Sequence, residues 1–224
     1  MATTLAFDVY GSLIDTQGIV EELAKHIGKL ALEFSRTWRA KRLEYSFRRG
    51  LMQRYENFVC CTKDAFHYTA SVMKLSFEPR AEDCILEAYN RLPSFPDVHG
   101  SLAALRGSGF RLFAFSNGLP GAVGTLLSVA GIRGFFEDVV SVDEVRSFKP
   151  SPAVYRLFLE RSGAVAGDAW LISSNPFDVI GAISSGMRSA WIRRSPEVVF
   201  DPWGIDPTIT VSTLAELNTT PLSS

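Results

Sequence analysis

The feature that most constrains this chain is the alternation of short apolar runs with helical segments between residues 98 and 192. The apolar runs predict strands over 110–115, 139–142, 169–172 and 189–192. The helical patterns that precede them cover 98–106, 121–130, 152–162 and 177–185. A further short strand and helix are expected within 208–217. Repeated strand–helix units predict an α/β fold, with a parallel sheet, right-handed crossovers and helices on both faces.

Another strand is expected near the N-terminus, where the apolar run Leu5-Ala6-Phe7 is followed by Asp8 and then by Gly11. An unpaired carboxylate costs several kcal/mol to bury, so Asp8 should point out of the strand end into a polar site. Ligands of open parallel sheets bind at that edge. This segment alone leaves two interpretations open, a functional aspartate or one that merely caps the next turn.

Between these two regions, residues 16–92 have a helical pattern and no expected strand. The pattern predicts helices over 19–34, from Arg36 into the 55–58 region, over 62–73 and over 81–92. The connector Pro93-Ser94-Phe95-Pro96 then predicts a boundary. The chain is therefore divided into one unit of residues 1–15 plus 93–224 and an inserted helical unit of residues 16–92.

The second expected helix is rich in basic residues, namely Arg36, Arg39, Lys41, Arg42, Arg48, Arg49 and Arg54. A run of like charges is usually a solvated face. Because the same helix carries many aromatic residues, an alternative is that one arginine faces inward into a pocket.

Composition excludes several classes of protein. A net charge of −1 gives no global attraction to nucleic acid or to an anionic membrane. No apolar stretch approaches the roughly 20 residues needed to span a bilayer, and no secretory signal is visible at the start. Three cysteines, two of them adjacent, do not form a disulfide framework, and no His/Cys spacing resembles a zinc site. A cytoplasmic protein is the simplest expectation.

Polar residues follow several of the expected strands, where they should converge at one edge of the sheet. They are Asp8, Ser116, Asn117, Ser173, Ser174, Asn175 and Asp178, and Lys149 precedes a proline at a helix start. One such residue usually caps the next helix. Several on the same edge are harder to explain by capping.

Four segments resemble the four motifs of the haloacid dehalogenase superfamily, in order and across the whole chain. They are Asp8-Val9-Tyr10-Gly11-Ser12, Ser116-Asn117-Gly118, Lys149-Pro150 and Ser173-Ser174-Asn175-Pro176-Phe177-Asp178. The resemblance implies a Rossmann-like core, with residues 16–92 as the cap domain inserted after the first strand. Within the superfamily, the pattern is most similar to the hydrolytic (S)-2-haloacid dehalogenases.

Two departures from the pattern of the magnesium-dependent phosphatases of this superfamily also favour a dehalogenase. Tyr10 stands where a phosphatase has the aspartate that protonates its leaving group, and a halide leaves without a proton. Ser174 and Asn175 are neutral where Mg²⁺ needs hard oxygen ligands, which leaves Asp8 and Asp178 as the only carboxylates expected there. We therefore expect no metal and no cofactor.

The segment Trp38-Arg39-Ala40-Lys41-Arg42-Leu43-Glu44-Tyr45 resembles the cap-helix signature of the 2-haloacid dehalogenases. By this resemblance, Arg39 and Asn117 take up the departing halide. A guanidinium is weakly hydrated, permanently charged and rich in donors, which suits an anion in a dry pocket. Ala40 stands where relatives often carry a polar residue, so the pocket is expected to differ in detail.

The resemblance implies that Asp8 attacks C2 of a 2-haloacid, giving an ester and inverting C2, and that water then attacks the ester carbonyl. Lys149 would pair with Asp8 and keep it ionised, and Asp178 would activate the water with Ser173 and Asn175. Ser12, Ser116 and the backbone N–H groups near Val9 and Tyr10 would hold the substrate carboxylate. Tyr155 would orient Lys149 or the substrate, and the apolar walls would be Tyr10, Leu43, Phe58 and Phe177.

The expected reactants are a small (S)-2-haloalkanoic acid and water, and the resemblance implies a homodimer. One rival hypothesis is a phosphomonoesterase of the same superfamily with an altered metal site. Another is a non-catalytic relative used as a binding module, against which the retention of Asp8, Lys149 and Asp178 speaks.

Overall fold

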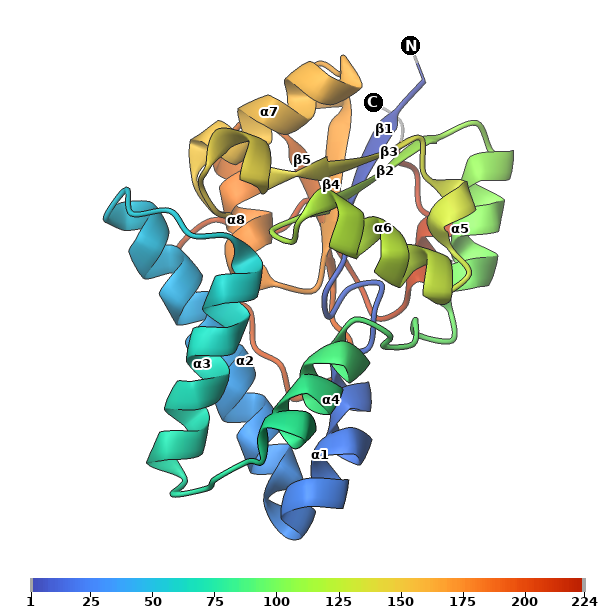
Figure 1. Cartoon of the computed structure of the whole chain (residues 1–224). Coiled ribbons are helices and arrows are strands. Elements are labelled where there is room, and N and C mark those ends of the chain that lie inside the picture. The colour runs from blue at the N-terminus through green and yellow to red at the C-terminus, as the bar shows by residue number, and fades with distance from the viewer. Residues whose placement is uncertain (1, 223–224) are drawn as a thin grey trace.

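The computed structural model describes residues 2–222 and contains a six-stranded parallel sheet with a group of helices at one end (Figure 1). The strands are β1 (Thr4–Asp8), β2 (Arg111–Ser116), β3 (Asp138–Ser141), β4 (Ala169–Ser173), β5 (Arg188–Ile192) and β6 (Ile209–Val211). Their order is β3-β2-β1-β4-β5-β6, and every neighbouring pair is parallel. The predicted parallel α/β sheet is confirmed, and β1 lies at its centre.

Alternating side chains of the strands divide the core into two layers, as the period of a strand requires. Leu5 and Phe7 pack on the side of α5 (Val98–Gly107) and α6 (Pro120–Val129). Ala6 faces the opposite side, with α7 (Pro152–Ser162) and α8 (Pro176–Ser184). Helices therefore cover both faces of the sheet, and both faces of its central strands are apolar.

Residues 16–92 form the second group of helices, which we call the helical block. Its main elements are α1 (Ile19–Ile27), α2 (Ala31–Leu51), α3 (Phe58–Val72) and α4 (Pro79–Tyr89). The rings of Phe34, Trp38 and Phe66 meet edge to face in its interior, with centroids 5.2–6.1 Å apart. Trp38 also donates from Nε1 to the Thr62 carbonyl oxygen at 2.8 Å, which joins α2 to α3.

The two segments that connect the helical block to the sheet run side by side. Asp15 N donates to the Pro93 carbonyl oxygen at 2.8 Å, and Phe95 N donates to that of Leu13 at 3.0 Å. Ile14 and Ser94 form an antiparallel bridge between these bonds. This pairing supports the proposed division of the chain at residues 15 and 93, because the block leaves and rejoins the sheet at one place.

Two boundaries predicted for the helical block are wrong. The helix expected over 19–34 ends at Ile27, because Gly28 takes a left-handed φ of 54°. The next helix, α2, then runs without a break through the boundary expected near residue 35. Phe58 opens α3 rather than closing α2, since the Asn57 side chain accepts from Cys60 N at 3.1 Å and caps the new helix.

Short 3-10 helices complete the chain, at Thr16–Gly18, Gly28–Leu30, Arg133–Phe135, Val142–Val145, Ala166–Asp168 and Leu214–Asn218. No helix within residues 2–222 is long and apolar enough to cross a bilayer. Cys60, Cys61 and Cys84 all carry free thiols.

Candidate active site

Asp8 ends the central strand, so its carboxylate lies at the carboxyl edge of the sheet. It is 7% exposed and hydrogen-bonded on both oxygens. Oδ2 accepts from Ser12 Oγ at 2.8 Å, from Asn175 Nδ2 at 2.8 Å and from Ser173 Oγ at 3.4 Å. Oδ1 accepts from Lys149 Nζ at 3.2 Å. The segments after β1 and β4 thus meet around one carboxylate, as expected for strand ends of a parallel sheet.

Lys149 lies between two carboxylates. Its Nζ donates to Asp8 Oδ1 at 3.2 Å and to Asp178 Oδ2 at 2.8 Å, and its third bond goes to the Phe115 carbonyl oxygen at 2.9 Å. Lys149 is 1% exposed, so these bonds replace water around its ammonium group. Asn117 Oδ1 accepts from Lys149 N at 3.0 Å, which fixes the lysine backbone to the end of β2.

Asp178 lies in the first turn of α8 and is fully buried. Its Oδ1 accepts from the Tyr155 hydroxyl at 2.8 Å. Burial raises the pKa of Asp178 to about 6, and the nearby charge of Lys149 opposes that rise. A carboxyl group whose pKa is raised by burial suits a role as proton acceptor. Burial also raises the pKa of Tyr155, so its phenol stays a donor.

The serines of the site act mainly as links between loops. Ser12 Oγ, besides donating to Asp8, accepts from Ser174 N at 2.8 Å, and Ser174 Oγ donates to the Gly11 carbonyl oxygen at 2.8 Å. Gly11 has a φ of 85°, a conformation that a side chain would strain. Ser116 is buried, and its Oγ accepts from Gly118 N at 3.1 Å. The bonds of Ser12 and Ser174 join the segments after β1 and β4, whereas the Ser116 bond stays within the segment after β2.

Arg39 reaches this edge from the helical block. It lies on α2, and its Nη2 donates to Asn175 Oδ1 at 2.6 Å while Asn175 Nδ2 donates to Asp8. Burial lowers the pKa of Arg39, and the positive charge of Arg42 lowers it further. The arginine singled out by the cap-helix signature is thus two hydrogen bonds away from Asp8.

The residues expected to form apolar walls do not form one cluster. Tyr10 and Phe58 approach each other, with ring centroids 6.2 Å apart, and Phe177 packs edge to face on Phe47 at 5.0 Å. The Val9 side chain is fully buried in the core beneath the sheet edge, so only its backbone is available to a ligand. Leu43 is half-buried on α2.

Ser173 and Asn175, which the sequence predicts to help position a water with Asp178, both donate to Asp8. The physical reason is register: β4 pairs with β1, so the residues ending β4 come to the end of β1. Tyr155 and Lys149 are the side chains that contact Asp178.

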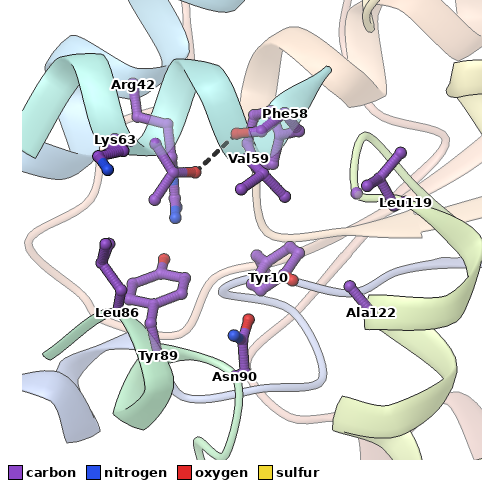
Figure 2. Close-up of a pocket in the computed structure, with 12 residues that line it drawn as sticks. Tyr10, Arg42, Phe58, Val59, Lys63, Leu86, Tyr89, Asn90, Leu119 and Ala122 are labelled. Atoms are coloured by element: carbon purple, nitrogen blue, oxygen red, sulfur yellow. Dashed lines mark hydrogen bonds between the residues drawn. The ribbon is translucent and has the colours of Figure 1, made fainter. Parts of the chain in front are cut away.

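Sequence reasoning missed two residues that line the adjoining pocket. The Arg42 guanidinium lies over the Tyr89 ring at one wall of this pocket, and Tyr10 also lines it (Figure 2). The spacing from Arg39 could have indicated Arg42, because residues three apart on a helix share a face and the cap-helix signature places Arg39 at the site. Tyr89 carried no such signal, because its place depends on how α4 packs.

The donor set at this edge does not suit Mg²⁺, which requires several hard oxygen ligands in octahedral geometry. Asp8 and Asp178 both hold the Lys149 ammonium, and the neighbouring Ser174 and Asn175 are neutral. Among residues 2–222, no three His, Cys, Asp or Glu side chains form a group able to hold a metal ion.

The family of the chain follows from a sequence comparison. A model of the haloacid dehalogenase-like hydrolases matches residues 2–186, which is most of the chain. The chain belongs to this family.

Individual members of the family are similar over almost their whole length. Haloacetate dehalogenase H-2 of Moraxella sp. (strain B) is 38% identical over 207 residues, covering 92% of this chain and 92% of the relative. The (S)-2-haloacid dehalogenase of Pseudomonas sp. (strain YL) is 36% identical over 210 residues, covering 94% and 90%. The predicted resemblance to the (S)-2-haloacid dehalogenases is therefore confirmed.

Solved structures of the haloacid dehalogenase-like hydrolases agree with the fold. The L-2-haloacid dehalogenase of Xanthobacter autotrophicus, with chloropropionic acid covalently bound, has a TM-score of 0.92 and 29% sequence identity. The match covers 98% of this chain and 98% of that one. The sheet and the helical block are thus shared with an enzyme that was solved with chloropropionic acid covalently bound.

Proposed function

We propose that this protein hydrolyses (S)-2-haloalkanoic acids to (R)-2-hydroxy acids and halide, through an ester on Asp8. The observation that carries the proposal is the buried arrangement of Asp8, Lys149 and Asp178, in which a single ammonium bridges two carboxylates. The substrate class is supported by relatives named (S)-2-haloacid dehalogenase, which are similar to this chain over most of their length.

The first step is displacement at C2. An oxygen of Asp8 attacks C2 opposite the halogen, the carbon–halogen bond breaks with its electron pair, and the halide leaves toward Arg39 and Asn117. No proton is needed, because a halide ion is a weak base. Oδ1 suits the role of nucleophile, since it has a single donor, whereas Oδ2 accepts from three side chains.

The second step is hydrolysis of the ester. Water attacks Cγ of Asp8, and Asp178 accepts its proton as the tetrahedral intermediate forms. The three donors on Oδ2 are placed to stabilise the negative charge that develops on that oxygen. Collapse breaks the Cγ–Oδ1 bond, and the departing alkoxide takes the proton held by Asp178, which releases the 2-hydroxy acid with inverted C2. The water oxygen stays on Asp8, whose carboxylate is restored when its remaining proton passes to solvent. Neither step requires a metal or an organic cofactor.

Substrate binding is proposed to use the remaining polar groups at the sheet edge. Ser12, Ser116 and the backbone N–H groups of Val9 and Tyr10 would hold the carboxylate, and Tyr155 would orient the Asp178–Lys149 pair. Tyr10, Leu43, Phe58 and Phe177 would exclude water.

The decisive experiment is a single turnover in H₂¹⁸O with excess enzyme and (S)-2-chloropropionate. The ester route places ¹⁸O in Asp8, which peptide mass spectrometry detects, and leaves the first product unlabelled. Label appearing directly in the 2-hydroxy acid would contradict it. The Asp8→Asn variant should lose halide release by roughly 10⁴-fold or more, and Asp83→Asn, which changes an exposed carboxylate on α4, is the matched control.

Two further assays separate the rival hypotheses. Halide release should survive EDTA, and the (R)-enantiomer should react poorly. Magnesium-dependent release of phosphate from a panel of phosphomonoesters would favour the phosphatase instead. A cytoplasmic homodimer is also proposed, and light scattering of the purified protein tests its mass.

A further inference from the structure

Arg42 is an almost completely buried cation surrounded by aromatic rings. It lies on α2 one turn after Arg39 and is 2% exposed. Its Cζ lies 4.6 Å from the ring centroid of Tyr89, 5.1 Å from that of Phe58 and 5.6 Å from that of Tyr10. Figure 2 shows its side chain pointing from α2 into the space above Tyr89. We call Arg42 with these three rings the aromatic cage.

The aromatic cage contains no compensating negative charge. Arg42 Nε has no hydrogen-bond partner among the described residues. Three other cations of α2 are paired, Lys41 and Arg48 with Glu44 and Arg49 with Asp64. A cation–π contact contributes about 0.5–2 kcal/mol, whereas removing a charge from water costs several kcal/mol. Because arginine stays protonated, the remaining deficit can be met by a bound anion.

A cavity lies against the aromatic cage. Its volume is about 140 Å³, and its wall also includes Gly118 and Leu119, which directly follow Asn117. One water needs only about 10–15 Å³ of such space, so a small anion fits. The wall is mainly apolar, and Lys63, which also lines it, has its ammonium 3.7 Å from Glu82 Oε1. The cavity therefore adjoins the segment expected to contact substrate.

The aromatic cage is also connected to Arg39. A small space of about 10 Å³ is lined by both Arg39 and Arg42. Arg42 lowers the pKa of Arg39, so the two guanidinium groups are close enough to repel each other. An anion near both would relieve that repulsion.

We propose that the aromatic cage is an anion-binding subsite beside the reaction centre, and that its ligand is a small, singly charged anionic group. A guanidinium is permanently charged and rich in donors, and apolar walls disfavour multiply charged ions such as phosphate. Two sources can supply this chemistry, the departing halide or a second carboxylate on a dicarboxylic 2-haloacid. These sources rest on the proposed function, but the subsite itself does not.

The first experiment measures anion binding without turnover. Chloride-35 NMR line widths are recorded with wild-type protein, Arg42→Met and Arg36→Met, and bromide is titrated to displace chloride. Met keeps an unbranched chain without charge, and Arg36 is an exposed arginine on the same helix. We expect Arg42→Met to bind halide at least about tenfold more weakly, a loss of about 1.4 kcal/mol in binding free energy. Arg36→Met should bind halide as the wild type does. Circular dichroism checks that each variant is folded, and Arg42→Lys should retain part of the binding.

The second experiment identifies the source of the anion. Rates with (S)-2-chlorosuccinate and (S)-2-chlorobutyrate, which differ by a carboxylate in place of a methyl group, are compared in the same variants. If a substrate carboxylate is the ligand, Arg42→Met lowers the chlorosuccinate to chlorobutyrate ratio of kcat/KM at least about tenfold. If the halide is the ligand, Arg42→Met raises the inhibition constant of bromide instead.

The proposal is overturned if wild type and Arg42→Met agree in halide binding, bromide inhibition and substrate ratio. Arg42 would then be a structural cation held by aromatic faces alone. Failure of both substrates to release halide would refute the proposed function, while the NMR comparison would still decide whether the subsite exists.

Discussion

Lys149 and Arg42 are both almost completely buried, at 1% and 2% exposure, but the groups around them differ in kind. The Lys149 ammonium donates to the carboxylates of Asp8 and Asp178 and to a backbone carbonyl. Arg42 faces three aromatic rings, and its Nε lacks a hydrogen-bond partner within residues 2–222. The first cation is neutralised within the resting protein, and the second is not.

This difference separates two uses of a buried charge. A cation paired with carboxylates contributes to stability through its partners, since removing it leaves buried anions uncompensated. A cation held only by ring faces can be removed without leaving a partner behind, and it can accept an anion from outside. Substitution of the two cations should therefore have very different effects on stability.

The largest effect is expected for Lys149→Met. The substitution leaves Asp8 and Asp178 adjacent, buried and without their common partner, so the free energy of unfolding should fall by about 3–5 kcal/mol at neutral pH. Halide release should also be lost. Urea denaturation followed by circular dichroism measures the first effect. The exposed Lys25→Met, whose ion pair with Glu22 lies on the surface, is the control; equal stability of the two variants would contradict the comparison.

Gly181→Ala should disturb the same centre without changing any charge. A Cβ at residue 181 would lie 2.8 Å from Pro150 Cβ and closer still to the Tyr155 hydroxyl that donates to Asp178. We expect a loss of about 1–3 kcal/mol in stability from this crowding, together with a lower kcat. Gly124→Ala on α6 meets no atom within 4 Å and should be neutral or stabilising by up to about 1 kcal/mol. Unchanged stability and kcat in Gly181→Ala would show that the position of the Tyr155 hydroxyl is not important.

The pH dependence of kcat should report the ionisation of Asp178. The proposed base must be ionised, and its pKa is raised to about 6, so activity should fall as the pH drops through about 6. Tyr155 donates to Asp178 and thereby lowers that pKa. Tyr155→Phe should therefore move the acid limb upward by about one pH unit. A limb that stays in place, or moves down, would contradict the assignment of Asp178 as the base.

The smallest effect is expected for Arg42→Met on stability. Loss of cation–π contacts and relief of a buried, uncompensated charge act in opposite directions, so the free energy of unfolding should change by less than about 1 kcal/mol. Denaturation in low chloride, compared with high bromide, gives the measurement. A loss as large as that of Lys149→Met would mean that Arg42 has a structural partner, and the distinction between the two cations would fail.

Much of the site could be predicted because a parallel sheet aligns the ends of its strands. Asp8, Ser116 and Ser173 each end a strand, and pairing of β1 with β2 and β4 brings them together. The helix boundaries near residues 28 and 58 were mispredicted, because apolar spacing alone does not reveal a left-handed glycine or an Asn cap. Boundaries depend on single backbone conformations, whereas strand order depends on a repeated pattern.

The sequence by itself determined the α/β class and the family, since each rests on periodicity or on motifs contiguous in the chain. Only the tertiary structure decided which arginine of α2 faces which group: Arg39 contacts Asn175, and Arg42 enters the aromatic cage. That cage combines Tyr10, Phe58 and Tyr89, which come from three separate segments. Their meeting depends on how α2, α3 and α4 pack over the sheet edge, and side-chain packing between distant segments leaves no periodic trace in a single sequence.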